Sequence, residues 1–246
     1  MPEGPSIVIL REQASSFAGR IIVRASGNAK VDLTRLADRR VVALRSFGKQ
    51  FLIQLPNELS IRVHLLMFGS YRIDEARDIA PRLHLGFGMR ELNFYNCSVR
   101  LLEGDLDALY DWRADVMSEQ WDPALARAKL RGMPTTLVCD ALLDQNVFAG
   151  VGNIIKNEVL FRIRVHPLSQ VGALSRYKLN QLVDQARVYA FEFLAWKKAH
   201  VLARHWLVHN RGRCPRHDVP LQRAHLGKTH RRSFFCNRCQ KLHTGT

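Results

Sequence analysis

The chain has 246 residues, 47% of them hydrophobic, which is enough for one large domain or two smaller ones with packed cores. Its 37 Lys and Arg against 22 Asp and Glu give a formal net charge of +15. This charge favours a polyanionic partner, with nucleic acid ahead of a ribosomal or anionic-lipid surface. The sequence has no run of about 18 apolar residues and no signal-peptide pattern, so we expect no membrane association. It predicts a cytoplasmic monomer, nucleoid-associated at most.

The first residues, Met1-Pro2-Glu3-Gly4-Pro5, form a pattern that can carry chemistry. Pro2 is small, so we expect a methionine aminopeptidase to remove Met1 and leave a secondary amine with a pKa near ~8. Such an amine can attack a sugar carbon and form a Schiff base, and Glu3 beside it is placed to move protons. The alternative is a frayed terminus without a role.

The first half of the chain has the pattern of one helix followed by β-rich runs. Apolar residues at helical spacing predict an amphipathic helix over 7–17. Runs separated by Gly, Pro and Asn turns predict strands at 20–25, 40–45, 51–55, 60–66, 70–73, 90–95 and 98–102. We predict a β-sandwich domain of roughly eight strands over residues 1–111, closed at one end by the first helix.

Helical periodicity dominates the second half, so the fold class is α+β with several domains. The predicted helices cover 123–130, 135–143, 153–161 and 175–199. We predict a hinge over 112–120, a helical domain over 121–208, and a Cys- and His-rich terminal region over 209–246.

Three of the five cysteines lie in that terminal region, in two pairs of ligand residues. Cys214 and His217 form one pair and Cys236 and Cys239 the other; each has a two-residue gap, and 18 residues separate the pairs. This spacing is typical of a structural zinc on a β-hairpin, which the metal would fold. His225, His230 and His243 are competing candidates for the fourth ligand. Cys97 and Cys139 lie in apolar stretches and are expected to be buried thiols.

A Gly-rich turn, Ala149-Gly-Val-Gly-Asn153, precedes the helix predicted at 153–161. Backbone N–H groups at a helix N-terminus, with Asn153 as the cap, can bind a phosphate, and Lys156 adds positive charge. A plain structural turn between helices is the alternative. Arg231, just before the second cysteine pair, is either a solvated arginine or a clamp on phosphate or a base edge.

Five motifs, taken together, resemble the formamidopyrimidine-DNA glycosylase/endonuclease VIII family over essentially the whole chain. They are Met1-Pro-Glu-Gly-Pro5, Gly48-Lys49, His64-Leu-Leu-Met67, Ala149-Gly-Val-Gly-Asn153 with Glu158, and Arg231-x-Ser-Phe-Phe-Cys-x-x-Cys239. The resemblance implies a bifunctional enzyme that removes oxidised bases from damaged DNA and cleaves the abasic strand by β,δ-elimination. It also implies an N-terminal β-sandwich, a helix-two-turn-helix domain and a C-terminal zinc-finger hairpin holding one structural Zn²⁺.

The resemblance assigns roles to individual residues. Pro2 matches the Schiff-base nucleophile, Glu3 the general acid/base, and Lys49 the catalytic lysine of a β-hairpin. Asn153, Lys156 and Arg231 match DNA-binding positions. Because the damaged nucleotide must be flipped out of the duplex, wedge side chains are needed, and Leu66, Met67 and Phe68 are the candidates. Packing in the core is the alternative for these three.

Departures from the family pattern bear on the substrate. The segment 93–100 lacks the Arg-Phe pair of the formamidopyrimidine branch, and Gly4 resembles the residue at this position in endonuclease VIII. Both departures favour oxidised pyrimidines over 8-oxoguanine as the substrate. Ser6 stands where endonuclease VIII has a glutamate, and His217 replaces a finger cysteine. The alternatives are an 8-oxoguanine glycosylase and a non-catalytic zinc-finger protein that binds damaged DNA.

Overall fold

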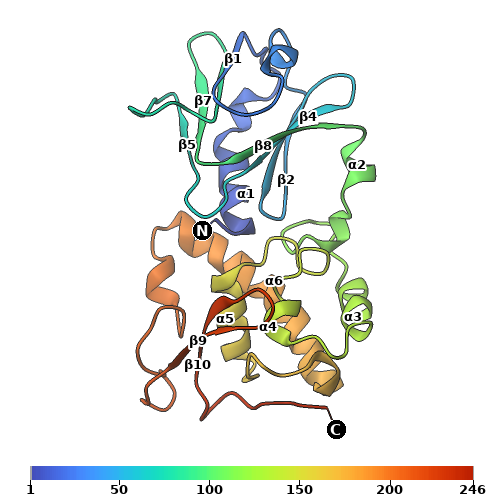
Figure 1. Ribbon diagram of the computed structural model, residues 1–246, viewed down its shortest axis with the longest axis vertical. Helices are drawn as coiled ribbons and strands as arrows, with labels where there is room; N and C mark the ends of the chain where they lie inside the picture. The colour runs from blue at the N-terminus through green and yellow to red at the C-terminus, as the bar shows by residue number, and fades with distance from the viewer. Residues whose placement is uncertain (1, 246) are drawn as a thin grey trace. The chain divides into compact units, whose positions relative to one another are not determined.

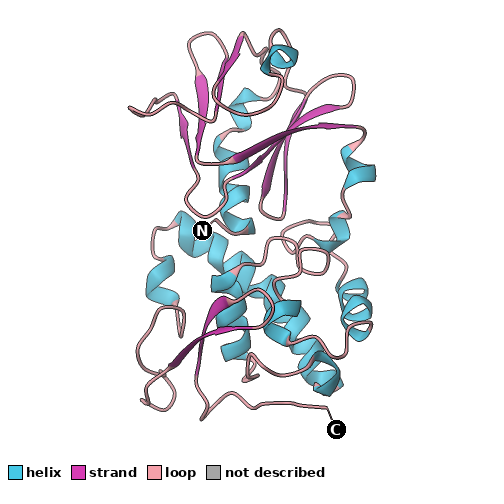
Figure 2. Ribbon diagram, in the orientation of Figure 1, coloured by secondary structure: helices cyan, strands magenta, loops and turns pink. Residues whose placement is uncertain are grey.

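A computed structural model describes residues 2–245, and the chain divides into two compact units between Asp111 and Trp112. The first unit is built mostly of strands, and the second mostly of helices with one β-hairpin (Figure 2). The finer boundaries expected at 112–120 and at 208/209 stay predictions.

The elements of the first unit follow one another in the predicted order, helix first and strands afterwards. They are α1 (Gly4–Gln13), β1 (Arg24–Ser26), β2 (Ala43–Phe47), β3 (Gln50–Gln54), β4 (Leu59–His64), β5 (Ser70–Ile73), β6 (Leu83–Gly86), β7 (Glu91–Tyr95), β8 (Ser98–Glu103) and α2 (Leu106–Leu109), with 3₁₀ turns at Ser15–Phe17 and Leu33–Leu36.

The strands of the first unit form two antiparallel four-stranded sheets, ordered β1-β6-β7-β5 and β2-β3-β4-β8 (Figure 1). Phe51 on β3 and Phe94 on β7 bring their ring centroids to 6.0 Å across the space between the sheets. Both belong to one buried apolar cluster to which α1 contributes Ile7 and Leu10. The predicted β-sandwich with an N-terminal helix is therefore confirmed.

Three details of the predicted strands are wrong. Strand β6 was missed because Gly86 and Gly88 look like turn residues, yet Leu83 and Leu85 are buried in the core. The runs at 20–25 and 40–45 are strands only from Arg24 and Ala43 onward, respectively. The run at 60–66 ends at His64, and the backbone of Leu66 has a φ of +53°, which strand geometry does not allow.

The second unit is a helical body followed by a hairpin. Its elements are α3 (Pro123–Arg131), α4 (Val138–Ala141), α5 (Asn153–Arg162), α6 (Arg176–Lys198), β9 (Gln222–Leu226) and β10 (Arg231–Phe235), with 3₁₀ turns at Trp112–Ala114, Val171–Ala173 and Leu202–His205. Helix α3 starts where Asp122 accepts hydrogen bonds from the N–H groups of Ala124 and Leu125, with a proline in its first turn.

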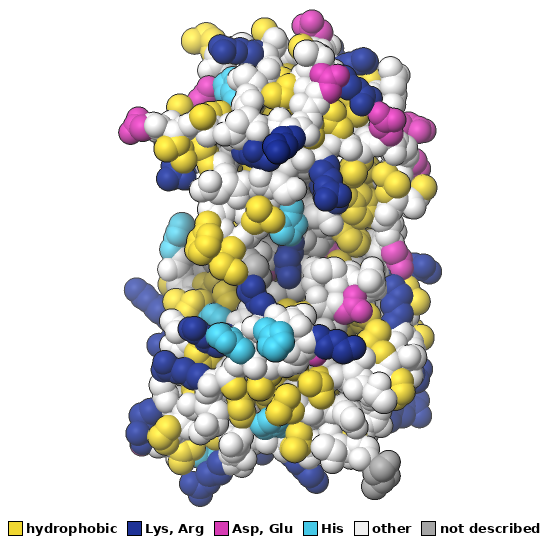
Figure 3. Space-filling model, viewed as in Figure 1, with side chains coloured by type: hydrophobic (Ala, Val, Ile, Leu, Met, Phe, Trp, Pro, Cys, Tyr) yellow, Lys and Arg dark blue, Asp and Glu magenta, His cyan; other side chains and the backbone are white. Residues whose placement is uncertain are grey.

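Helix α5 is buried on nearly all sides and occupies the middle of the second unit. Its last turns also support the hairpin, because Phe161 shares a small core with Leu221 and Phe234. Among the described residues no helix is long and apolar enough to cross a membrane. On the face drawn in Figure 3, Lys and Arg side chains are spread over both units and outnumber Asp and Glu, in keeping with the charge of +15.

Candidate functional site

The N-terminal residues lead directly into α1. Glu3 is the residue before the helix, its backbone is extended, and its side chain is only 1% exposed. Gly4 and Pro5 are buried behind it, and the carbonyl of Glu3 accepts a hydrogen bond from Ser6 N–H (2.8 Å). Pro2 therefore precedes a fixed helix start and not a frayed segment. Met1, whose removal the sequence predicts, lies outside the described residues.

Lys49 lies in the two-residue turn between β2 and β3. Gly48 has a φ of +54°, which a hairpin turn with glycine at its first central position requires. Helix α1 packs against β2 and β3, so the turn belongs to the same packed body as Glu3. His64, paired with Gln50 across the sheet, is half-buried; burial lowers its pKa, and the charges of Lys49 and Arg62 lower it further. His64 is therefore neutral at physiological pH.

The three apolar residues after β4 lie on the surface, in a tight loop over residues 65–69. Leu66 and Met67 are about half exposed and Phe68 is 79% exposed, so the core packing considered from sequence does not apply. Gly69 N–H donates to the carbonyl of Leu65 (2.7 Å), and Leu66 N–H donates to Nδ1 of His64 (3.1 Å). The loop is thus held in shape by its own backbone while its side chains face outward.

At the start of α5, side chains converge on the backbone of β10. Asn153 Nδ2 donates to the carbonyl of Arg232 (2.9 Å), and Asn157 Nδ2 approaches the same oxygen (3.4 Å). Lys156 is only 1% exposed, and its Nζ donates to Ser233 Oγ (2.8 Å). These contacts bring two predicted DNA-binding residues, Asn153 and Lys156, to the strand that begins with Arg231.

Two further residues of this region were missed as site candidates. Glu158 is fully buried, and its carboxylate accepts the backbone N–H groups of Leu207, Val208 and His209 at 2.7–3.0 Å. Because an amide nitrogen can only donate, Nδ1 of His209 accepts from Asn157 Nδ2 (3.2 Å). Burial lowers the pKa of His209 to about 4, with the nearby Lys156 charge adding to the effect. The sequence signal was the polar run 156–158 inside an apolar helix.

The four predicted metal ligands come together at the base of the hairpin. One ligand atom from each of Cys214, His217, Cys236 and Cys239 lies within 4.8 Å of all the others. The Sγ atoms of Cys214 and Cys239 are 3.8 Å apart, close to the ~3.8 Å between two sulfurs each about 2.3 Å from a tetrahedral zinc. The competing histidines are outside this group in the described chain. The cluster is therefore consistent with a zinc site.

Comparisons with known proteins agree with this architecture. The family described as "Formamidopyrimidine-DNA glycosylase N-terminal domain" matches residues 1–98, and the "Formamidopyrimidine-DNA glycosylase H2TH domain" matches residues 114–194. The chain is 32% identical over 205 residues to "Probable endonuclease 8 2" of Streptomyces coelicolor, covering 76% of this chain and 72% of that protein. It is 28% identical over 233 residues to "Endonuclease 8-like 3" of Xenopus laevis. That match covers 89% of this chain but only 38% of the relative, so this chain spans about two fifths of its length.

Solved structures show the same fold. A Lactococcus lactis formamidopyrimidine DNA glycosylase, described as bound to DNA containing an AP site, superposes with a TM-score of 0.85 at 21% identity, covering 97% of this chain and 99% of that one. The β-sandwich, the helix-two-turn-helix body and the hairpin with a Cys₃His cluster place the chain in a class of DNA repair glycosylases. The chain belongs to the formamidopyrimidine-DNA glycosylase/endonuclease VIII family.

Proposed function

We propose that the chain is a bifunctional DNA glycosylase and AP lyase that removes oxidised pyrimidines from damaged DNA. The observation that carries the proposal is the Pro2-Glu3 pair at a fixed helix start, with a buried carboxylate next to the residue that becomes the terminal amine. A protein that only binds damaged DNA has no need of this pair.

In the proposed reaction the nitrogen of Pro2 bonds to C1′ of the damaged nucleotide as the glycosidic bond breaks and the base leaves with a proton. The C1′–O4′ bond of the sugar ring then opens, with a proton passing to O4′, and C1′ becomes an iminium. The iminium acidifies the C2′ hydrogens, so the 3′ phosphate and then the 5′ phosphate can be eliminated. Glu3 moves the protons in these steps. Its side chain is buried directly after Pro2, at the residue before α1.

Lys49 supplies positive charge from the β2–β3 turn. We assign it to a phosphate next to the reacting sugar, where its charge favours the developing negative charge. The charge of Lys49 contributes to the lowered pKa of His64, after burial, which is in keeping with a positive charge close to this site.

The second unit contributes the phosphate site. The first N–H groups of α5 attract an anion, and Asn153 has two amide hydrogens, of which one bonds Arg232 and the other can donate to phosphate. The buried Lys156 contributes positive charge to this phosphate site and holds β10 in place through its hydrogen bond to Ser233. Arg231 contacts DNA directly. Leu66, Met67 and Phe68 form the wedge that fills the space of the flipped nucleotide.

The Cys₃His cluster holds one structural Zn²⁺, which ties the two ends of the hairpin together. Tetrahedral spacing of the ligand atoms supports zinc, and the hairpin carries Arg231 at the start of β10. We expect a monomer acting on DNA in the cytoplasm.

Borohydride trapping tests the whole proposal. One preparation has an N-terminal tag, and the matched control is the same protein after proteolysis leaves Pro2 as the first residue. On duplexes carrying thymine glycol, dihydrouracil, 8-oxoguanine or an abasic site, the processed protein gives a covalent adduct mapped to Pro2, strongest with the pyrimidine lesions. The tagged protein gives none but keeps salt-sensitive DNA binding. If the adduct forms mainly with 8-oxoguanine, the protein is an 8-oxoguanine glycosylase. If no adduct forms with any DNA, the protein binds damaged DNA without catalysis.

A further inference from the structure

The turn that carries Lys49 is closed by one pair of residues. Phe47 at the end of β2 and Gln50 at the start of β3 face each other across the turn Gly48-Lys49. A lysine places its charge at the end of a flexible four-carbon chain, so the position of its Nζ depends on how firmly the backbone of the turn is held. The contacts that fix this pair of residues therefore affect where Lys49 presents its charge.

Tyr110, which lies 60 residues beyond Gln50 in the chain, contacts both members of this pair. Its ring centroid lies 4.7 Å from that of Phe47, with the two planes inclined at 45°. Its hydroxyl donates a hydrogen bond to Oε1 of Gln50 (2.8 Å). Burial raises the pKa of Tyr110, so the hydroxyl keeps its proton and remains a donor at physiological pH. One side chain thus holds the turn by packing on one strand and by hydrogen bonding to the other.

Tyr110 is itself held against the sheet. Its N–H donates to the carbonyl of Leu106 (3.0 Å), a fully buried residue at the start of α2. Asp107 of the same helix forms an ion pair with Arg45 of β2, with 2.7 Å between oxygen and nitrogen. Helix α2 and Tyr110 are therefore attached to the strand that leads into the turn, and these contacts keep the ring of Tyr110 against Phe47.

We propose that Tyr110 is a positioning residue for Lys49. This inference rests on the proposed function, in which Lys49 binds a phosphate next to the reacting sugar. While Phe47 and Gln50 are held, Lys49 meets the phosphate from one direction, whereas a looser turn spreads its charge over several positions. A displacement of about 1 Å in an active site can cost about 100-fold in rate, so a hydroxyl that touches no substrate still affects the chemistry.

The test is a double-mutant cycle in the full chain with Pro2 as its first residue. Tyr110→Phe keeps the ring against Phe47 and removes only the hydroxyl, and Lys49→Ala removes the charge that the hydroxyl positions. The measured quantity is the single-turnover rate of borohydride-trapped adduct formation on a saturating duplex with an abasic site. We expect Tyr110→Phe to lower this rate about 5- to 20-fold when Lys49 is present. In the Lys49→Ala protein it leaves the rate unchanged, because two residues that act through one group are not additive.

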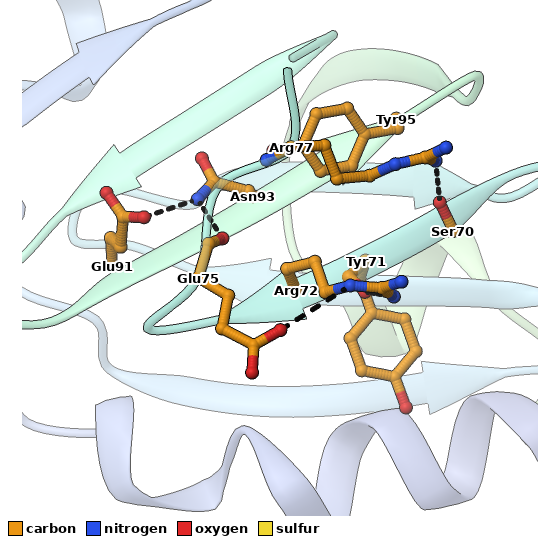
Figure 4. Close-up of polar contacts among 8 residues, drawn as sticks. All are labelled: Ser70, Tyr71, Arg72, Glu75, Arg77, Glu91, Asn93 and Tyr95. Carbon is orange, nitrogen blue, oxygen red and sulfur yellow. Dashed lines mark hydrogen bonds and ion pairs between the residues drawn. The ribbon is translucent and has the colours of Figure 1, made fainter. Parts of the chain in front are cut away.

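Tyr71→Phe is the matched control. In Figure 4 the ring of Tyr71 points towards α1, where its hydroxyl donates to Oε1 of Gln13 (2.5 Å). The same two chemical groups are thus paired, but Tyr71 belongs to β5 in the other sheet of the first unit. Thermal unfolding is expected to show similar small losses of stability in Tyr71→Phe and Tyr110→Phe, whereas only Tyr110→Phe slows adduct formation. Equal rates in these two variants overturn the proposal, and so does an equal loss from Tyr110→Phe with and without Lys49.

The salt dependence of DNA binding gives a second readout that does not require the reaction. Lys49→Ala is expected to reduce the slope of log K against log salt concentration by about 0.9, the value for one phosphate contact. Tyr110→Phe reduces the slope in the same direction when Lys49 is present and leaves it unchanged in Lys49→Ala. A wild-type slope in Tyr110→Phe overturns the inference.

Trapping at Pro2 separates this inference from the proposed function. If the wild-type protein gives no adduct, the proposed function fails and this inference fails with it. If the wild-type protein is trapped normally and Tyr110→Phe is trapped at the same rate, only this inference is wrong.

Discussion

The α carbon of Gly227 lies directly against the carboxylate of Asp140, so that a Cβ at this position would overlap both carboxylate oxygens. Gly227 forms the turn between β9 and β10 with a φ of +69°. The same carboxylate accepts the N–H groups of Lys228 (2.9 Å) and Thr229 (3.3 Å). Asp140 on α4 therefore fixes the tip of the hairpin to the helical body.

Gly227→Ala is expected to expel the carboxylate and release the tip. Loss of these hydrogen bonds, together with the strained φ, lowers the free energy of unfolding by about 1–3 kcal/mol. DNA affinity falls too, because Arg231 begins the strand that follows this turn. Thermal unfolding and fluorescence anisotropy check both effects. Gly88→Ala, at a φ of +82° but with nothing within 4 Å of the added methyl, is the matched control and reports the backbone strain alone. Equal stability of the two variants would show that the contacts between Asp140 and the tip of the hairpin do not stabilise the protein.

Glu158 organises the segment 207–209, and its replacement by glutamine tests that role. The glutamine side chain can still accept at Oε1, but its NH₂ group faces a backbone N–H where the carboxylate has an acceptor. One buried N–H is left unsatisfied, so Glu158→Gln lowers the free energy of unfolding by about 1–3 kcal/mol. Denaturant unfolding measures the change. Glu192→Gln, which loses a partly exposed ion pair with Arg162, is the comparison and costs about 1 kcal/mol or less. Equal losses in the two variants would contradict the anchoring role.

The sequence predicted this fold where local pattern and final environment agree. Helices at 153–161 and 175–199 were predicted to within a residue or two because their apolar periodicity matches the face they bury. The metal ligands were predicted because coordination constrains the spacing along the chain. Strand β6 was not predicted, because Gly86 has the local pattern of a turn residue but becomes a strand residue once Leu83 and Leu85 pack inside.

Contacts between distant segments could not be predicted in this way. Nothing near Glu158 in the chain shows that residues 207–209 will bring three N–H groups to it. Likewise, the hairpin was expected to depend on metal alone, whereas Phe161 of α5 lies in its core. Buried polar residues in an apolar helix signal that partners exist, but only the folded chain identifies them.

Metal removal should change which thiols react. In metal-loaded protein at pH 8, iodoacetamide labels few thiols. A strong chelator releases one Zn²⁺ per chain and exposes three cysteines of the cluster to labelling. Burial raises the pKa of Cys97 and of Cys139 to about 11, so only about one in a thousand is thiolate at this pH. Mass spectrometry of peptides identifies the labelled sites. Labelling of Cys97 or Cys139 before Cys214, or protein isolated without zinc, would contradict this assignment.

Acidification should destabilise the second unit through His209. Unfolded histidine has a pKa near ~6.5, while burial and the neighbouring Lys156 hold the pKa of His209 at about 4. Between these values the unfolded state binds a proton that the folded state does not, so stability falls as the pH falls from 6.5 to 4. The loss reaches at most roughly 3 kcal/mol. His209→Gln keeps an acceptor for Asn157 and shows a flatter pH dependence of Tm. His225→Gln, on the exposed part of β9, retains the wild-type dependence.

The loop over residues 65–69 offers a test of whether its backbone shape matters for damage recognition. A Cβ on Gly69 would collide with the carbonyl of Leu65, which accepts the Gly69 N–H. This obstacle is backbone and cannot rotate away, so Gly69→Ala must open the loop and shift Phe68. We expect about 1–3 kcal/mol of lost stability, and a further loss of affinity for duplexes with an abasic site that undamaged duplex does not share. Gly212→Ala, where an added methyl meets nothing within 4 Å, is the matched control and stays near wild type. If both variants bind abasic DNA equally well, the shape of the loop does not matter for damage recognition, and the wedge assignment of Leu66, Met67 and Phe68 is wrong.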